Sequence, residues 1–506
     1  MNEDNSARRL HESTKHGTPP SDPERLVDYR RLDPHNVPSP FKEYRDVELI
    51  ELPRQFVTSS TPATDVLSGL NGETSRLDGE LLSTLLFLSA GVTRVMALPD
   101  RPVYFRAAMS AGNLHPVEVY LVVGEGSVDG VAEGVYHFSP LEFALRTLRK
   151  GDLRGVLGVD SPLALVLTGI PWRTSWKYGE RGWRHLYWDA GTMLANLLAV
   201  ADAHGLEHRT LLGFDDRATG DLLGIDGATE MPLAIIELGS GEKPVSPPGD
   251  LAPLSLDVGQ VAPNPIRLPL LEEAQHDSDL ESGEVDAWRC AGSSVAVPAP
   301  IEVPAPEGFD DPIEKVVLRR GSTRKMCHQA VPARHLEWPL AAATRAVGID
   351  AIPHRTLLDH YVNVHSVGGL DPGAYRRTDD VLQLMRSVEG VREQSASLCL
   401  GQALGGDSAY TVFHCAELEP LFSSLGARGY RVAQLEAGVV SGRLALCAFA
   451  LGLGATGLTF FDDAVASYFG TTAEPMLVTS VGVPAGPPAP AGTPGDPAVL
   501  SPPRAP

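Results

Sequence analysis

Apolar residues along the chain form short continuous runs and longer stretches at helical spacing, a pattern that predicts a mixed α and β fold. Runs at 117–123, 163–169 and 233–239 are bounded by polar or turn residues and predict buried strands. Residues 190–204 have apolar side chains at helical spacing before a glycine, which predicts a helix. Small residues on its apolar face favour close packing against another helix. Residues 437–451 repeat this pattern.

Four short motifs occur twice, always 247 positions apart. RGWR, DAG, HGL and FDD of the first half return as RGYR, EAG, LGL and FDD at 428–431, 436–438, 451–453 and 461–463. A repeat of this length indicates two copies of one domain, as in a dimer fused into a single chain.

Three segments poor in apolar residues divide the chain into two bodies, 41–241 and 313–483. Residues 1–40 are charged, residues 242–312 mix proline, alanine and acids, and residues 484–506 are rich in proline and alanine. We expect little order in these segments, although the middle one has an apolar stretch that could form structure. The middle segment is also long enough to let the two bodies pack as a pseudo-two-fold pair.

Composition excludes several classes of protein. A chain of 506 residues with a net charge of −22 can bury two cores but would repel nucleic acid. Its five cysteines include no CxxC pair, which disfavours a disulfide framework and a structural zinc site. The first residues do not resemble a signal peptide, and no apolar run approaches the length of a membrane span. We therefore expect a soluble cytoplasmic protein that binds neither membranes nor nucleic acid.

The strongest local signal in the first body is the small-residue sequence RAAMSAGNLHP, from Arg106 to the start of a predicted strand. Small residues such as Gly112 let the backbone approach a flat ligand, and Ser110 and Asn113 could bond to a ring edge. The alternative is an ordinary loop with a proline at the start of the strand.

The second body begins with RRGSTR at 319–324, in which Arg320, Ser322 and Arg324 could hold a terminal phosphate through guanidinium and hydroxyl groups. The alternative is a solvated basic patch.

Two other patterns do not support the sites they suggest. Residues 452–457 match GxGxxG, but they follow a predicted helix and precede a strand, the reverse of a dinucleotide-binding turn. The histidines include no HExxH pair, and we assign no metal site.

The sequences SAGNLHP, KYGERGWR at 177–184 with the following DAG, and FDD resemble the SagB-type branch of the FMN-dependent nitroreductase superfamily. That branch includes dehydrogenases that oxidise thiazoline and oxazoline rings to thiazoles and oxazoles in ribosomally made peptides. The resemblance implies an α+β fold that dimerises and holds flavin mononucleotide (FMN) at the interface. The whole chain would then be a tandem nitroreductase-like fold, with two fused copies forming a pseudo-dimer.

The resemblance assigns cofactor binding to three groups of residues. A basic segment of one subunit grips the phosphate, a small-residue loop of the other lines the flavin ring, and the GxGxxG segment lies near the flavin. The residues implied here are Arg320, Ser322 and Arg324 for the phosphate, Arg106, Ser110, Gly112 and Asn113 for the loop, and Gly454 and Gly457 for the third group.

The two copies depart from the family pattern in complementary ways. The first body has no RRSxR-like segment at 53–69, and the second has no recognisable ring-edge loop at 346–353. We therefore expect one composite FMN site per chain, with the related second site empty.

By the same resemblance, Lys177 and Tyr178 are the catalytic pair. A phenolate favoured by the adjacent ammonium could accept a proton while the neighbouring ring carbon gives a hydride to the flavin. The second copy has Ser424 and Leu425 at these positions and could not substitute. The alternative is a surface charge beside a packing aromatic.

The sequence thus predicts an FMN-dependent azoline dehydrogenase acting on a precursor peptide. Oxygen is the expected electron acceptor because no NAD site is visible, and a cyclodehydratase is a candidate partner. The alternatives are an NAD(P)H-dependent nitroreductase acting on small molecules, and a catalytically silent subunit that binds a peptide or partner.

Overall fold

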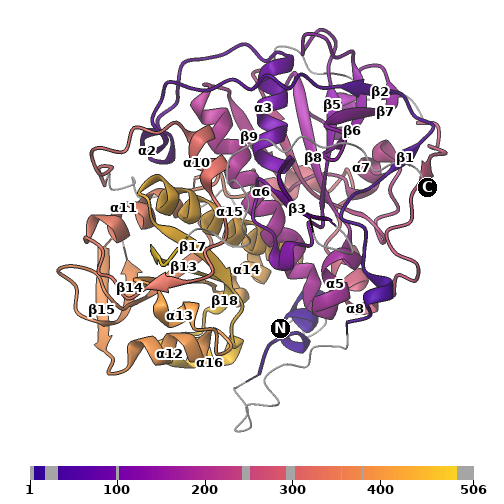
Figure 1. Ribbon diagram of the computed structural model, residues 1–506. Helices are drawn as coiled ribbons and strands as arrows, with labels where there is room; N and C mark the ends of the chain where they lie inside the picture. The colour runs from indigo at the N-terminus through magenta and orange to yellow at the C-terminus, as the bar shows by residue number, and fades with distance from the viewer. Residues whose placement is uncertain are drawn as a thin grey trace.

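Two antiparallel sheets lie on either side of a central pair of long helices, α6 (Gly182–Ala203) and α15 (Arg428–Ala450), as Figure 1 shows. The computed structural model describes residues 5–17, 32–97, 102–241, 245, 251–291, 303–354, 356–378 and 381–486.

The two sheets share one strand order. The first runs β2-β7-β6-β5-β8-β10-β9, and the second contains the path β15-β14-β13-β16-β18-β17, with β12 also paired to β18. The first sheet consists of β2 (Leu49–Glu51), β5 (Val117–Val123), β6 (Gly134–Ser139), β7 (Ala144–Lys150), β8 (Leu163–Gly169), β9 (His208–Leu211) and β10 (Met231–Leu238). The second consists of β12 (Met326–Cys327), β13 (Leu358–Val364), β14 (Gly373–Thr378), β15 (Val381–Ser387), β16 (Tyr410–Ala416), β17 (Gly454–Leu458) and β18 (Glu474–Pro484). Strand for strand, the path from β7 to β9 matches the path from β15 to β17, as two copies of one fold require.

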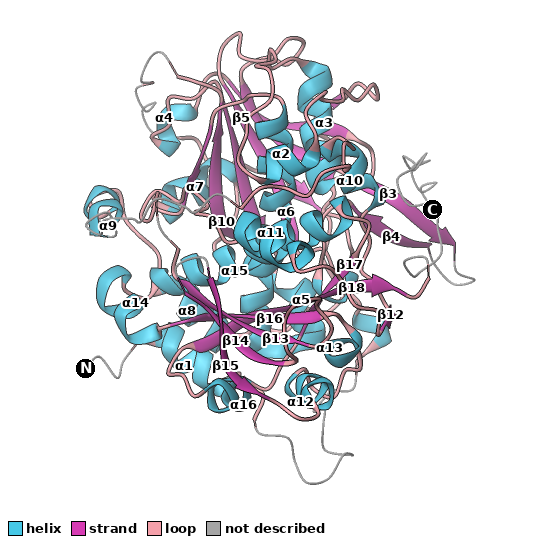
Figure 2. Ribbon diagram, turned by 90° about the vertical axis from the view of Figure 1, so that its left-hand side faces the viewer, coloured by secondary structure: helices cyan, strands magenta, loops and turns pink. Residues whose placement is uncertain are grey.

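Helices and two small ribbons surround these sheets (Figure 2). In the first half of the chain the helices are α1 (Ser6–Ser13), η2 (Pro34–Asn36), α2 (Ala63–Leu67), α3 (Gly79–Ala90), η3 (Ala111–Asn113), α4 (Arg154–Leu157), α5 (Pro171–Tyr178), η4 (Gly179–Arg181) and α7 (Asp216–Leu223). The rest are α8 (Pro269–His276), α9 (Val285–Ala291), α10 (Ile313–Arg319), α11 (Arg334–Ala343), α12 (Val391–Leu398), α13 (Leu404–Asp407), α14 (Leu418–Leu425) and α16 (Asp462–Phe469). The ribbons pair β1 (Tyr44–Arg45) with β11 (Asp257–Val258), and β3 (Val92–Ala97) with β4 (Pro102–Arg106).

The predicted strands are confirmed, and the predicted helices are longer than expected. β5 and β8 have the predicted bounds, whereas β10 begins two residues before the predicted start. Both α6 and α15 begin at the repeated RGWR and RGYR motifs, well before the predicted helices. The first turns of both helices carry charged residues, so the apolar pattern did not predict that these turns belong to buried helices. They are buried because their charges form ion pairs in the folded structure.

The two long helices touch at equivalent glycines. A Cβ atom added to Gly191 of α6 would lie 2.7 Å from the Cα of Gly438 in α15. A Cβ on Gly438 would in turn lie 3.0 Å from the Cα of Gly191. The two glycines are 247 positions apart, so the repeat meets itself at this point, as in a two-fold dimer.

Two buried clusters of arginine and aspartate join the bodies. Each body supplies the arginines of one cluster and the aspartate of the other, and all these side chains are buried. The ion pairs are Arg181–Asp462 (3.0 Å), Arg184–Asp462 (2.7 Å), Arg428–Asp216 (2.5 Å) and Arg431–Asp216 (2.8 Å). Burial alone would raise the pKa of Asp462, but the two guanidiniums lower it well below its usual range. Removing one partner of such a buried pair typically costs about 3–5 kcal/mol.

These clusters also correct the expectation of disorder. Helix α1 lies within the 1–40 segment, and α8 and α9 lie within 242–312. Arg184 donates to the carbonyl of His11 in α1 at 2.8 Å, and Arg431 donates to the carbonyl of Gln275 in α8 at 2.5 Å. Each helix is ordered because it supplies acceptors to buried guanidiniums. Residues 1–4, 18–31, 242–244, 246–250, 292–302 and 487–506 of the expected disordered segments lie outside the described residues.

Among the helices in the described ranges, α15 alone is long and apolar enough to cross a membrane. All of its residues are buried within the protein. Its apolar character is accounted for by packing against α6 and the second sheet.

We predict that Gly191→Ala lowers the free energy of unfolding by about 2–3 kcal/mol, because the new methyl group meets backbone atoms of α15 that cannot rotate away. Urea denaturation would measure the change. Gly283→Ala is the matched control, since nothing lies within 4 Å of a Cβ there. Equal stability of Gly191→Ala and the wild type would contradict the close helix contact.

Candidate functional site

The loop between β4 and β5 is held in shape by its own side chains. Ser110 Oγ donates to Asp189 Oδ2 at 2.5 Å and accepts from the His115 backbone N–H at 2.8 Å. Asn113 Nδ2 donates to the Tyr104 carbonyl at 2.9 Å, and its Oδ1 lies 3.0 Å from His115 Nε2. Ser110 and Asn113, predicted to meet a flavin ring, therefore also build the loop that would carry the contact.

Asp189 is a site residue that the sequence analysis did not single out. It lies on α6, is 4% exposed, and accepts from Ser110 Oγ and from the Ala111 N–H at 3.0 Å. Burial raises its pKa to about 7, although both hydrogen bonds act in the opposite direction. Its counterpart in the repeat, Glu436, accepts from the Leu357 N–H at 2.9 Å. The shared acid of DAG and EAG was the signal that could have identified it.

Arg106 supports this loop from its base. Its Nη2 donates to the Pro40 carbonyl at 2.6 Å and its Nη1 to the Val117 carbonyl at 3.4 Å. The guanidinium also lies 5.3 Å from the centre of the Phe41 ring. Its hydrogen bonds thus go to backbone carbonyls outside the SAGNLHP segment.

Arg320 reaches from the second body into the first. Its backbone follows α10, its side chain is buried, and its Nη2 donates to the carbonyl of Ala107 in the small-residue loop at 2.7 Å. Burial and then the charge of Arg94 lower its pKa to about 10. No ion pair joins Arg320 to a carboxylate within the described ranges, and its Nε has no hydrogen-bond partner there. The neighbouring Arg319 instead pairs with Asp311 at 2.5 Å.

The structure brings the predicted catalytic pair to the same loop. A Cβ added to Gly112 would lie 2.9 Å from Tyr178 Oη and 3.3 Å from Lys177 Nζ. Lys177 Nζ lies 5.2 Å from the centre of the Tyr178 ring, which stacks on His185 at 4.1 Å. Burial and then the charge of Arg324 lower the pKa of Lys177. Loop, catalytic pair and basic segment therefore meet at one place, with groups from both bodies.

Strand β17 supports the basic segment. Ser322 forms a bridge with Ala455, and the Thr323 N–H donates to the Ala455 carbonyl at 3.1 Å. Gly454 is buried against Thr323, whose Cγ2 would lie 3.0 Å from an added Cβ, while Gly457 on the same strand is exposed. β17 follows α15 in the chain, so the GxGxxG segment has the helix-to-strand order that the sequence predicts.

At the related position of the other copy, side chains of the middle segment contact the second body. Trp288 of α9 donates from Nε1 to the carbonyl of Leu425 at 2.9 Å, and Leu425 lies 247 positions after Tyr178. Arg289 pairs with Asp350 at 3.0 Å. A cavity of about 260 Å³ remains, lined by Arg209, Leu211, Arg289, Gly348, Asp350 and Pro353. These contacts place side chains of the middle segment at the position related to the candidate site.

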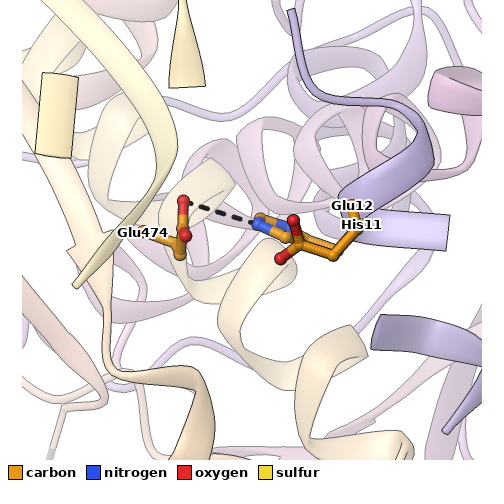
Figure 3. Close-up of side chains that lie close together, drawn as sticks. All are labelled: His11, Glu12 and Glu474. Carbon is orange, nitrogen blue, oxygen red and sulfur yellow. Dashed lines mark ion pairs between the residues drawn. The ribbon is translucent and has the colours of Figure 1, made fainter. Parts of the chain in front are cut away.

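Among the described residues, one group has the composition of a metal site. His11, Glu12 and Glu474 point toward one another, as Figure 3 shows. Lys15 Nζ lies 3.0 Å from Glu12 and 2.8 Å from Glu474, so an ammonium already neutralises the two carboxylates. His11 Nδ1 is also bonded to Tyr430 Oη at 2.8 Å. We assign this group to holding α1 in place.

We predict that Asp189→Asn changes how stability depends on pH. An aspartate in an unfolded chain ionises near pH 4, whereas folded Asp189 keeps its proton to about pH 7. The native state therefore binds more protons in this window, and stability falls as pH rises, by up to about 1.4 kcal/mol per pH unit. The isosteric amide should remove this slope in urea denaturation from pH 4 to 7. Glu73→Gln, an exposed carboxylate, is the control, and an unchanged slope in Asp189→Asn would refute the buried acid.

Comparisons with known proteins agree with the fold described above. A nitroreductase family model matches residues 77–240. A protein of Methanocaldococcus jannaschii described as a nitroreductase is 28% identical over 167 residues, which cover 31% of this chain and 78% of that protein. The microcin B17-processing protein McbC of Escherichia coli is 31% identical over 149 residues, or 27% of this chain, and the match spans only 55% of McbC.

A crystal structure of an Anabaena variabilis protein, also described as a nitroreductase, has a TM-score of 0.75 and 25% identity, covering 95% of this chain and 99% of the other. Residues 77–240 are therefore a nitroreductase-family domain, and the chain as a whole has the predicted mixed helix and sheet, nitroreductase-like fold.

Proposed function

We propose that this protein is an FMN-dependent dehydrogenase that oxidises thiazoline or oxazoline rings in a ribosomally made peptide. The observation that carries the proposal is the meeting of Arg320 from one body with the small-residue loop and Lys177 and Tyr178 of the other. This is the composite arrangement that the complementary losses in the two copies predict.

The residues present fit a flat, anionic cofactor. Arg320 is a buried guanidinium that forms no ion pair within the described part of the chain, so a phosphate would supply the missing negative charge. Ser322 and the exposed Arg324 extend this basic segment, and Gly112 lets the loop backbone lie close to Lys177 and Tyr178. FMN bound here would supply the two-electron acceptor for the reaction.

Lys177 and Tyr178 then serve proton transfer. Aromatising an azoline removes a proton from one ring carbon and a hydride from its neighbour, so a base must stand beside the hydride acceptor. The Tyr178 hydroxyl lies against Gly112, at the surface where the ring would bind. The depressed pKa of Lys177 makes its neutral form more accessible at working pH. We assign proton acceptance to this pair acting together.

Similarity to a microcin B17-processing protein supports a peptide substrate. We propose an azoline-containing precursor peptide as substrate, a cyclodehydratase as the partner that forms the ring, and oxygen as the electron acceptor. The net charge of −22 and the burial of α15 favour a cytoplasmic enzyme that acts on neither nucleic acid nor membranes.

Similarity to the archaeal protein described as a nitroreductase favours a second candidate, an NAD(P)H-dependent reductase of small molecules. The two candidates differ in their electron donor. Rapid bleaching of the flavin by NAD(P)H would favour the reductase, whereas bleaching by an azoline peptide would favour the dehydrogenase. A protein that binds no FMN would support the silent binding subunit instead.

We predict that the wild type binds about one FMN per chain and that the double variant Arg320→Ala/Arg324→Ala loses at least about 100-fold in affinity. Two charge-assisted contacts worth about 1.5–3 kcal/mol each would disappear. Flavin fluorescence titration measures the dissociation constant. Arg324→Ala alone tests whether the exposed part of the basic segment contributes to FMN affinity, and it leaves the buried Arg320 in place. Arg54→Ala is the control, because Arg54 lies in the corresponding segment of the first copy. Unchanged affinity in the double variant would remove the phosphate assignment.

We predict that Tyr178→Phe keeps its FMN but oxidises an azoline peptide at least about 100-fold more slowly, because it keeps the stacked ring and loses the hydroxyl. Stopped-flow bleaching of the flavin by the peptide measures the chemical step. Ser424→Ala, at the position related to Lys177, should react like the wild type. Normal turnover by Tyr178→Phe would exclude the hydroxyl and leave Lys177 as the proton acceptor.

A further inference from the structure

Arg94 has no role in the site as predicted from the sequence, yet it lies close to Arg320. It belongs to β3, which with β4 forms a two-stranded ribbon that extends away from the main sheets (Figure 2). Its guanidinium lies 5.1 Å from the centre of the Phe105 ring on β4. Its Nη1 atom is buried and has no hydrogen-bond partner within the described ranges. The side chain is thus held in place with an unused donor.

Arg94 and Arg320 bring two like charges together from different bodies. In the pairing of β3 with β4, Arg94 lies opposite Phe105, two residues before Ala107, whose carbonyl accepts from Arg320 Nη2 at 2.7 Å. In keeping with this placement, burial and then the charge of Arg94 lower the pKa of Arg320. Each also keeps a buried nitrogen without a hydrogen-bond partner, Nη1 of Arg94 and Nε of Arg320. Two guanidiniums that share a partly buried space without a counter-ion destabilise the folded chain unless an anion joins them.

Other buried arginines of this protein show the contrast. Arg173 pairs with Glu118 at 2.5 Å, and the arginines at the starts of α6 and α15 pair with Asp462 and Asp216. Across the described residues no such ion pair is formed by Arg94 or Arg320. Two other buried arginines, Arg106 and Arg443, donate to two backbone carbonyls each. Within the described residues, Arg320 has only the Ala107 carbonyl and Arg94 has neither kind of acceptor, which leaves both available to an external anion.

We propose that Arg94 is a further phosphate ligand, which clamps the terminal phosphate of the flavin from the first body while Arg320 holds it from the second. This inference rests on the proposed FMN site and adds a phosphate ligand from the body that otherwise supplies the ring-edge loop, Lys177 and Tyr178. Phosphate would then join the two bodies directly.

Riboflavin, which lacks the phosphate, provides the test. We expect Arg94→Ala to weaken FMN binding by about 10-fold to 100-fold and to leave riboflavin affinity within about 3-fold of the wild type. Arg94→Lys keeps the positive charge but lacks the planar guanidinium group. Its FMN affinity should lie between those of the wild type and Arg94→Ala. Arg76→Ala, which removes an exposed arginine of the same body, is the control.

The outcomes separate this inference from the proposed function. Wild-type FMN affinity in Arg94→Ala, or equal losses for FMN and riboflavin, would overturn the role of Arg94 and leave the FMN site intact. A wild type that binds neither flavin would overturn both. In a double-mutant cycle with Arg320→Ala, we expect the two losses of FMN affinity to be non-additive, because both side chains contact one phosphate.

Discussion

The contact between α6 and α15 is the constraint on which the rest of this structure depends. Gly191 and Gly438 let the two helix backbones approach, and any side chain at either position would meet backbone atoms of the other helix. On either side of this contact, buried arginines of each body pair with an aspartate of the other. Separating the two bodies would leave these buried charges without their partners, which is strongly destabilising. The relative position of the two bodies is therefore fixed, and so is any site that they share.

That shared geometry generates two related clefts, and a fused chain lets them diverge. In one cleft the small-residue loop, Lys177 and Tyr178 face the basic segment around Arg320. In the other, Trp288 and Arg289 of the middle segment bond to the corresponding backbone and loop positions. A symmetric dimer of identical chains could not place such a segment at one of the two positions alone. The middle segment thus acts as part of the fold as well as the connection between the copies.

Charge is distributed differently in the structural and the candidate functional regions. The structural arginines are matched by carboxylates or backbone carbonyls, which keeps their charge compensated without a ligand. At the candidate site, guanidiniums and the Lys177 ammonium approach one another in a protein of net charge −22. Such local excess of positive charge in an acidic protein is the property expected of an anion-binding site. Burial and then the charge of Arg324 lower the pKa of Lys177.

The repeat, the three buried strands, the basic segment and the small-residue loop could all be predicted from the sequence, because each depends on local pattern or on motifs retained at a fixed spacing. The starts of α6 and α15, the order of α1, α8 and α9, and the positions of Asp189 and Arg94 could not. The helix starts depend on buried ion pairs with distant parts of the chain, and Asp189 and Arg94 acquire their surroundings only when distant segments pack together. The sequence by itself determined which groups each copy kept, whereas the tertiary structure decided which of them meet, because ion pairs and close helix contacts act between residues hundreds of positions apart.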